Sequence, residues 1–281
     1  MIDLRIGGVP EHFNYPWYLT LKDKKYHEVG INLRWKDFDG GTGAMIEALN
    51  NQQIDLAVVL TEGIVKSIAE GAPLKIVQVY VSSPLFWGVH VAANTPYARA
   101  DQLKGHLAAI SRYGSGSHLM SYVYGQNNNW NTQTDLKFEE VGDLQGGLNS
   151  LTHGSSDYFL WEKFTTKPFV DKGVLRCMDT CPTPWPCFVI AVHQDFLKNH
   201  PSEIEAITTI INAQTKSFKQ LPLLVEQLAK RYGQNPEDLK LWLAQTQWSQ
   251  DIMTAEEIDL VQEELLKLKL IKQKCPSADF F

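Results

Sequence analysis

Cysteine, long apolar runs and clusters of positive charge are scarce in this sequence, and each scarcity excludes a class of protein. Only 4 of the 281 residues are cysteines, too few for the disulfide framework of a small secreted protein. The longest apolar stretches, 56–60 and 188–192, fall far short of the roughly 20 residues that cross a bilayer. Lys and Arg form no run and the net charge is -6, so the charge pattern of a nucleic-acid binder is missing.

Signatures of well-known catalytic and metal sites are also missing. The sequence has no Gly-x-Ser-x-Gly nucleophile elbow, no Walker A lysine and no His-Glu-x-x-His pair. The spacing of Cys177, Cys181 and Cys187 does not match the Cys-x-x-Cys pattern of zinc sites. A disulfide from Cys187 to one of the other two is expected only if the protein is exported. We therefore assign no catalytic residue, no metal ligand and no cofactor.

The first residues bear on where the protein is located. Met1 is followed by Asp3 and Arg5 instead of the apolar segment of a leader peptide. On that basis we expect a cytoplasmic protein. Removal of a leader ahead of Met1 would instead imply a periplasmic or lipid-anchored protein, and this alternative stays open.

The order of apolar and polar stretches predicts an alternation of strands and helices over the first two thirds of the chain. Predicted strands lie at 4–8, 31–38, 75–81, 87–92, 107–111, 137–141 and 185–192. After His193 the pattern changes, and predicted helices lie at 201–220, 223–232, 236–245 and 254–269. A helical tail of this length needs a surface on which to pack.

Two segments of the chain share one pattern. Each has an acidic residue and a glycine pair, a short helix ending in Leu, an Asp six residues after that Leu, and an apolar strand closed by Glu. The first segment runs from Asp39 to Glu62 and the second from Asp143 to Glu162. The pattern predicts a glycine-opened helix followed by a buried parallel strand, used twice. Chance similarity between two αβ units is the alternative.

The two similar halves and the helical tail together predict two lobes. We expect residues 1–91 and 192–281 to form lobe one and residues 92–191 to form lobe two. The two crossings of the chain would act as a hinge, and the C-terminal helices would pack on lobe one. The predicted fold class is therefore α/β, with two doubly wound lobes joined by a two-strand hinge.

Two glycine-rich turns are the main candidates for a binding site. Residues 40–43 follow the strand that ends at Phe38, and residues 114–117 follow the strand that ends at Ser111. Ligands of open α/β sheets bind at the carboxyl ends of the strands. Each turn also opens a helix, whose free N–H groups favour an anion. A plain helix cap is the alternative for each turn.

Aromatic and charged residues near other strand ends extend the candidate site. The loop after the first strand mixes His, Glu and aromatic residues, Glu62 and Glu162 end the two similar strands, and Arg112 stands beside the second turn. Core packing or simple surface exposure is the alternative for these side chains. The predicted ligand-binding residues are Pro10, Glu11, His12, Phe13, Gly41, Thr42, Gly43, Thr61, Glu62, Arg112, Gly114, Ser115, Gly116, Ser117, Trp161 and Glu162.

At these residues the chain resembles the type II periplasmic-binding-protein superfamily. The resemblance lies in residues 8–13, in the turn at 40–43 with the following 48–49 and 54–57, and in Leu103-Lys104-Gly105 ahead of the turn at 114–117. The branch it resembles contains sulfonate, taurine and nitrate solute-binding proteins and fungal thiamine-pyrimidine synthesis proteins. The resemblance implies a venus-flytrap fold with the ligand between the two glycine turns.

The same resemblance implies a function. It describes a solute-binding protein, similar to the substrate-binding proteins of ABC transporters, that closes around one small anionic organic molecule. The implied partners are that ligand and an ABC-transporter permease, with no nucleic acid and no membrane-spanning segment. The alternative is a cytoplasmic enzyme on the same scaffold, of the thiamine-pyrimidine or menaquinone-pathway type, using Glu62, His12 or Glu162 as acid/base groups. The chain does not match the adjacent cysteines of the pyrimidine-synthesis proteins.

Overall fold

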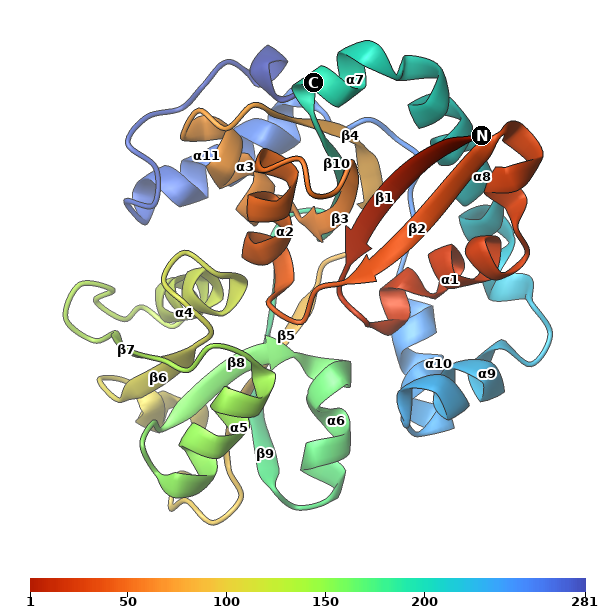
Figure 1. Ribbon diagram of the computed structural model, residues 1–281. Coiled ribbons are helices and arrows are strands. Elements are labelled where there is room, and N and C mark those ends of the chain that lie inside the picture. The colour runs from red at the N-terminus through yellow and green to blue at the C-terminus, as the bar shows by residue number, and fades with distance from the viewer. The chain divides into compact units, whose positions relative to one another are not determined.

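Two separate five-stranded sheets organise the chain, and the computed structural model describes all residues 1–281 (Figure 1). Unit 1 consists of Met1–Ser83 and Trp185–Phe281, and unit 2 consists of Pro84–Pro184. Each unit contains one mixed sheet with helices packed against it. The predicted α/β architecture of two lobes is therefore confirmed.

The chain passes from one unit to the other at 83/84 and again at 184/185, and the strand after each of these points belongs to the unit that the chain has just entered. β5 (Phe86–Ala92) pairs with strands of unit 2, and β10 (Phe188–His193) pairs with strands of unit 1. The boundaries expected from the sequence, at 91/92 and 191/192, would assign both strands to the other unit. Which unit a strand belongs to depends on the strands with which it pairs, and the local pattern of residues does not predict that pairing.

The sheet of unit 1 has the order β2-β1-β3-β10-β4. Besides β10, its strands are β1 (Ile2–Gly8), β2 (Ile31–Asp37), β3 (Leu56–Leu60) and β4 (Leu74–Val81). β1 runs parallel to β2 and β3, whereas β10 is antiparallel to β3 and β4. The carboxyl ends of β1, β2 and β3 consequently meet at one edge of the sheet.

The sheet of unit 2 repeats this arrangement with the order β7-β6-β8-β5-β9. Besides β5, its strands are β6 (Leu107–Ile110), β7 (Lys137–Glu140), β8 (Tyr158–Glu162) and β9 (Leu175–Pro182). β6 is parallel to β7 and β8, and β5 is antiparallel to β8 and β9. Position by position, β3 of the first sheet corresponds to β8 of the second.

This correspondence accounts for the two similar segments of the sequence. Asp55 precedes β3 and accepts the Arg5 backbone N–H of β1 at 2.7 Å. Asp157 precedes β8 and accepts the Leu107 backbone N–H of β6 at 2.9 Å. The aspartate thus fixes the register of β3 against β1 in one sheet and of β8 against β6 in the other, so the repeated Asp has one structural role used twice.

Burial on both faces of the sheet explains the apolar composition of β3. Residues Leu56 to Val59 are fully buried, as expected for a central strand covered by helices on both sides. Figure 1 shows α2 (Gly41–Asn50) and α3 (Thr61–Ala69) on one side and α1 (Tyr15–Lys22) on the other. Gly63 lets α3 approach α2 closely, because a Cβ there would lie 2.5 Å from the Thr42 methyl group.

The chain after His193 is helical, as predicted, and belongs to unit 1. Its helices are α7 (Gln194–Asn199), α8 (Pro201–Ser217), α9 (Leu224–Tyr232), α10 (Pro236–Gln245) and α11 (Ala255–Lys267). Short 3-10 helices are His12–Asn14, Lys25–Val29, Ala100–Leu103, Phe218–Gln220 and Ser277–Phe280. α8 packs on α1 and α11 packs on α3, so the helical tail covers both sides of the first sheet.

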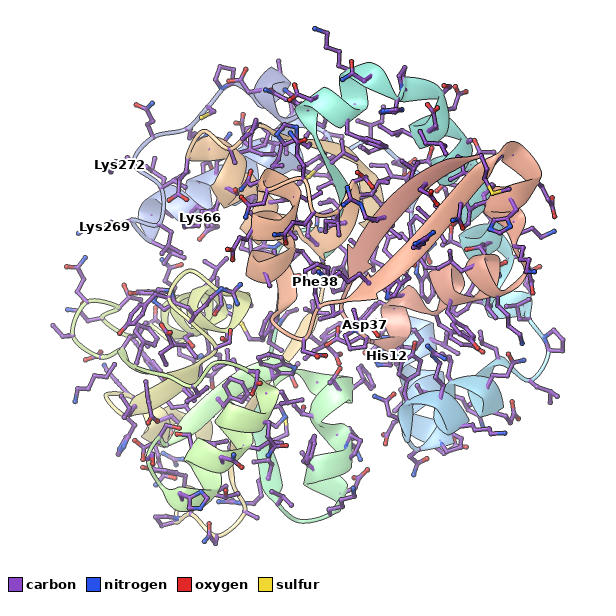
Figure 2. All side chains as sticks on the ribbon, in the orientation of Figure 1. His12, Asp37, Phe38, Lys66, Lys269 and Lys272 are labelled. Carbon is purple, nitrogen blue, oxygen red and sulfur yellow. The ribbon has the colours of Figure 1, made fainter.

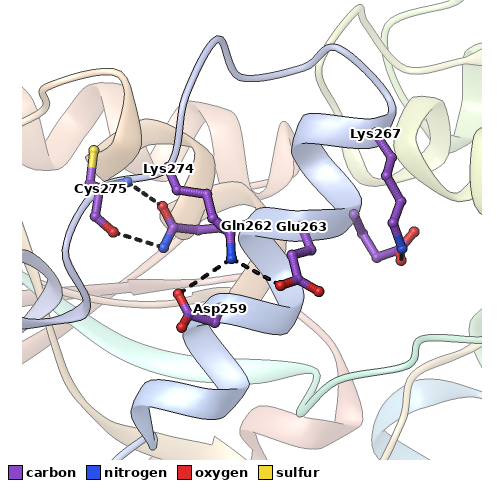
Figure 3. A network of polar contacts seen from close by, with 7 residues as sticks. Asp259, Gln262, Glu263, Lys267, Lys274 and Cys275 are labelled. Carbon is purple, nitrogen blue, oxygen red and sulfur yellow. Dashed lines mark hydrogen bonds and ion pairs between the residues drawn. The ribbon is translucent and has the colours of Figure 1, made fainter.

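The C-terminal segment is held by one buried amide side chain (Figure 3). Gln262 of α11 is fully buried; its Oε1 accepts the Cys275 N–H at 2.7 Å and its Nε2 donates to the Cys275 carbonyl at 3.0 Å. The Cys275 thiol donates to the carbonyl of Ala69 at 3.5 Å. Lys274 pairs at 3.0 Å with Glu263. These bonds attach the segment to both α11 and α3.

Unit 2 contains three α-helices and a strand pattern that the sequence only partly indicated. Its helices are α4 (Gly116–Asn127), α5 (Leu144–His153) and α6 (Lys163–Asp171). Neither α6 nor β9 was predicted. α6 contains Pro168 and two adjacent threonines, which are poor helix formers, and β9 alternates irregularly between buried and exposed positions. Both form because they pack against β5 and the core around Phe159.

The paired aspartates lead to a stability prediction. Replacing Asp157 by Ala leaves the Leu107 N–H without its acceptor and removes the 2.6 Å hydrogen bond that the Tyr97 hydroxyl donates to Asp157. We expect the free energy of unfolding to fall by about 1 to 3 kcal/mol. Asp157→Asn should lower the free energy of unfolding by less, because the amide oxygen can still accept the Leu107 N–H. Urea denaturation measures both. The exposed Asp101→Ala serves as a control, and an equal loss there would contradict the assignment.

Candidate functional site

The glycine turn of unit 1 begins α2 directly after β2 (Figure 2). Gly41 has a φ of 66°, a backbone conformation that side chains disfavour, so glycine is required there. Thr42 and Gly43 follow in the first turn of the helix. The Thr42 hydroxyl accepts the Leu60 N–H at 3.0 Å and so connects the start of α2 to the end of β3. This turn is therefore anchored to the carboxyl edge of the sheet.

The loop after β1 divides its predicted residues between surface and core. Pro10 is exposed and Glu11 is half-buried. His12 is 1% exposed and stacks on Trp242 of α10 with ring centres 4.2 Å apart. Burial lowers the pKa of His12 to about 3, so the ring is neutral, and neither of its nitrogens has a hydrogen-bond partner. The side chain of His12 is thus part of the core of unit 1.

Phe13 is also a core residue. Its side chain is 4% exposed and packs against Phe188 and Trp242, with ring centres 5.1 and 5.2 Å away. Its carbonyl accepts the Tyr80 hydroxyl at 2.9 Å and the Trp248 indole N–H at 3.3 Å. The aromatic residues of this loop therefore attach the carboxyl end of β1 to α10 and to the segment after it.

Glu62 is a buried carboxyl group in the first turn of α3, at the carboxyl end of β3. Its side chain is 2% exposed; Oε2 accepts the Trp185 indole N–H at 2.8 Å, and Oε1 is buried without a partner. Burial raises the pKa of Glu62 to about 7 against the opposing effect of its hydrogen bonds. The preceding Thr61 donates its hydroxyl to the Pro186 carbonyl at 2.5 Å. Together these two bonds connect α3 to the segment that enters β10.

In unit 2 the second glycine turn holds a cluster of buried serines at the start of α4. Ser117 Oγ accepts the Ser111 N–H at 2.9 Å and lies 3.0 Å from Ser115 Oγ. Ser115 caps the helix by accepting the His118 N–H at 3.4 Å. Gly114 has a φ of 80° and donates its N–H to His118 Nδ1 at 3.0 Å, and Gly116 is the first helical residue. The turn therefore gathers hydroxyl groups where the helix dipole is positive.

One basic residue, Arg112, adjoins this turn in the sequence. It lies between Ser111 and the turn and is partly buried. Burial lowers the pKa of Arg112, and the negative charge of Glu140 opposes that effect. An arginine stays charged throughout the physiological range, so the start of α4 combines a partly desolvated guanidinium with hydroxyl groups. These are the groups that bind carboxylate, sulfonate or phosphonate oxygens.

Glu162 and Trp161 end β8 in the position that corresponds to the end of β3. Glu162 is 3% exposed and caps α6, its Oε2 accepting the Thr165 N–H at 2.6 Å. Burial raises the pKa of Glu162 to about 7. Trp161 is partly buried and packs 5.1 Å from Phe159, next to the core of unit 2. Both units therefore carry a buried carboxyl group where the third strand turns into a helix.

Several residues that line a pocket of unit 1 are not among the ligand-binding residues predicted from the sequence. Asn14, Trp35, Asp37 and Arg231 surround a cavity of about 110 Å³ together with the predicted Pro10 and Glu11. They come from β2, α9 and the loop after β1, so no local motif connects them. Only the Asn in the aromatic loop gave a usable signal, as a polar residue close to a strand end.

No group of three or more His, Cys, Asp or Glu side chains is arranged to hold a metal ion. All four cysteines are free thiols. None of the helices is both long enough and apolar enough to span a membrane.

Comparison with known proteins identifies the fold. A family model described as Ca3427-like PBP matches residues 87–181. The Candida albicans CA3427 gene product, reported to have the generic periplasmic-binding-protein fold, is similar with a TM-score of 0.90 and 24% identity, over 99% of this chain and 93% of that chain. No curated protein matches the sequence.

Two further solved structures carry bound ligands. The alkanesulfonate-binding protein SsuA from Xanthomonas axonopodis pv. citri, bound to MOPS, has a TM-score of 0.80 and 16% identity, over 98% of this chain and 96% of that chain. PhnD1 from Prochlorococcus marinus, in complex with methylphosphonate, has a TM-score of 0.63 and 13% identity, over 96% and 99%. The chain therefore has the periplasmic-binding-protein fold, as the resemblance implied.

The buried carboxyl group of Glu62 generates a pH prediction. Its pKa is about 7 in the folded protein against 4.5 for an exposed glutamate. Between these values the folded state holds a proton that the unfolded chain releases, so this group's contribution to stability falls as pH rises through the window. Glu62→Gln removes the dependence and can still accept the Trp185 N–H. As the pH rises from about 5 to about 8, the free energy of unfolding of the variant should therefore increase by up to about 3 kcal/mol relative to that of wild type.

Thermal unfolding at the two pH values measures this gain. Glu47→Gln, on an exposed position of α2, is the matched control and should show the same difference from wild type at both pH values. A melting-temperature difference for Glu62→Gln that does not change with pH would show that Glu62 is ionised in the folded protein.

Proposed function

We propose that this chain is a solute-binding protein whose ligand is a small organic anion. The observation that carries the proposal is the start of α4, where the buried hydroxyl groups of Ser115 and Ser117 follow the partly buried Arg112 within five residues. The similar structures named for alkanesulfonate binding and for a methylphosphonate complex support an oxyanion as the ligand. A sulfonate or phosphonate presents several acceptor oxygens that one guanidinium and neighbouring donors can bind together.

Magnitudes show why the arginine matters. A helix N-terminus stabilises an anion by about 0.3 to 1 kcal/mol when exposed and about 2 kcal/mol when partly buried. Micromolar binding requires about 8 kcal/mol. The remainder has to come from charge-assisted hydrogen bonds and from apolar contacts in an enclosed site. Arg112 is already partly desolvated, so it loses less hydration when it binds a ligand oxygen than an exposed arginine would.

Two further proposals concern closure of the protein on its ligand and its partner protein. We propose that ligand binding is accompanied by closure of the protein, which small-angle scattering would detect as a smaller radius of gyration. We also propose an ABC-transporter permease as a partner, on the basis of the resemblance to ABC-type solute-binding proteins.

Substitution of Arg112 tests the proposed function. MOPS and methylphosphonate are suitable probes, because similar proteins contain them. We expect one of these compounds to raise the melting temperature of the wild-type protein. Arg112→Gln should weaken its binding by about tenfold or more, and Arg112→Lys should restore part of the loss, because lysine keeps the charge but not the forked geometry.

Arg99→Gln is the matched control, since Arg99 lies exposed on unit 2 and pairs only with Asp101. Calorimetric titration of the four proteins gives the affinities. The proposal is wrong if Arg112→Gln binds the probe as tightly as wild type, or if neither anion binds.

The buried carboxyl groups favour enzymatic activity as a second candidate function. The pKa of Glu62 is about 7, near the value that suits a general acid or base, and its Oε1 has no partner. Glu62→Gln would then abolish product formation while the variant still binds the compound. Mass spectrometry of the binding compound after incubation decides between the two functions, because a solute-binding protein returns its ligand unchanged.

A further inference from the structure

Unit 1 has a pocket that the proposed anion site does not use. It has a volume of about 110 Å³ and is lined by residues of the loop after β1, α1, the end of β2 and the end of α9. A cavity that holds a single water molecule needs roughly 10 to 15 Å³ of such volume. The pocket therefore has room for a small organic molecule. The residues that determine its chemistry are Asn14, Tyr18, Trp35, Asp37, Arg231 and Tyr232.

This pocket lies on the α1 side of the sheet, away from the glycine turn of α2. A Cβ at Gly7 would lie 2.7 Å from the Phe38 ring, and a Cβ at Gly8 would lie 2.3 Å from the Trp35 indole. Successive strand residues point to opposite faces, so Phe38 and Trp35 cover opposite faces of the sheet. Trp35 contacts Trp17 of α1, with ring centres 6.3 Å apart. Figure 1 shows α1 and α2 on the two sides of this sheet.

Hydrogen-bond acceptors are in excess at the end of β1 and β2. The Asn14 amide N–H donates to the Val9 carbonyl at 2.9 Å, but its Oδ1 is buried without a partner. Asp37 Oδ1 accepts the Trp35 indole N–H at 2.8 Å, which leaves further lone pairs on the carboxylate. A buried acceptor without a donor costs free energy that a donor-bearing ligand would recover. The pocket is thus suited to a ligand with N–H groups.

The charges and rings around the pocket favour a cation. Two carboxylates, Glu11 and Asp37, are present with one guanidinium, that of Arg231. That guanidinium lies 3.8 Å from the centre of the Tyr18 ring, so it already makes a cation–π interaction with that ring. Trp35 and Tyr232 provide further ring surface, which attracts organic cations and planar groups.

We propose that this pocket binds a small organic amine or amidine in its protonated form. Its N–H groups would donate to Asn14 Oδ1 and to the Asp37 carboxylate, and its apolar part would pack on Trp35 and Tyr232. This site is independent of the anion-binding function proposed for the start of α4. It would give the protein a ligand of opposite charge in unit 1.

Benzamidine is the probe that tests the proposal, with benzoate as a control of similar shape and opposite charge. Calorimetric titration of the full chain should show saturable binding of benzamidine and none of benzoate. Asp37→Asn keeps an acceptor for the Trp35 N–H but removes the charge, and it should weaken benzamidine binding by about tenfold. Asp23→Asn, an exposed position at the end of α1, should bind benzamidine as wild type does.

Three outcomes would overturn the proposal. They are an absence of saturable benzamidine binding, equal affinity in wild type and Asp37→Asn, and equal binding of benzoate. Circular dichroism of each variant verifies that it is folded. The Arg112→Gln variant should retain benzamidine binding, so failure of the amine pocket and failure of the anion site give different results.

Discussion

The parallel pairing of β1 with β3 in one sheet and of β6 with β8 in the other is the constraint on which the rest of this structure depends. In both units an aspartate accepts a backbone N–H, of β1 in unit 1 and of β6 in unit 2, and so fixes the register of β3 or β8. Parallel strands in this register end at one edge, and the helices that follow them begin there. Without that register, α3 and α6, which follow β3 and β8, would start at other heights along the sheet, and their first residues would not meet the strand ends.

Burial at the strand ends of each unit changes the charge of the carboxyl groups found there. Glu62 and Glu162 are acidic in the sequence, yet burial raises the pKa of each to about 7. Neither therefore carries a full negative charge near neutral pH, whereas Arg112 remains positive. The electrostatic character of the strand ends is consequently more favourable to an anion than the count of acidic residues indicates. Desolvation, more than sequence composition, determines this balance.

The same fold supports different ligand chemistry at different places. The start of α4 offers donors, through a guanidinium, hydroxyl groups and helix N–H groups, and suits oxyanions. The pocket of Asn14 and Asp37 offers acceptors and aromatic faces, and suits amines. The similarity to solved structures extends over nearly the whole chain at 24% identity or less, so the fold is shared, and a shared fold does not by itself determine the ligand.

The sequence alone determined the alternation of strands and helices, the helical tail and the repeated αβ segment, because hydrophobic periodicity, glycine turns and capping residues act over a few neighbouring positions. It also located the glycine and serine turns at strand ends, where a local rule places ligands. Only the tertiary structure decided that His12 and Phe13 pack in the core, since their partner Trp242 is more than 200 positions away. It alone assembled Asn14, Asp37 and Arg231 around one pocket. Contacts between distant segments depend on how elements pack, and no local pattern of residues encodes them.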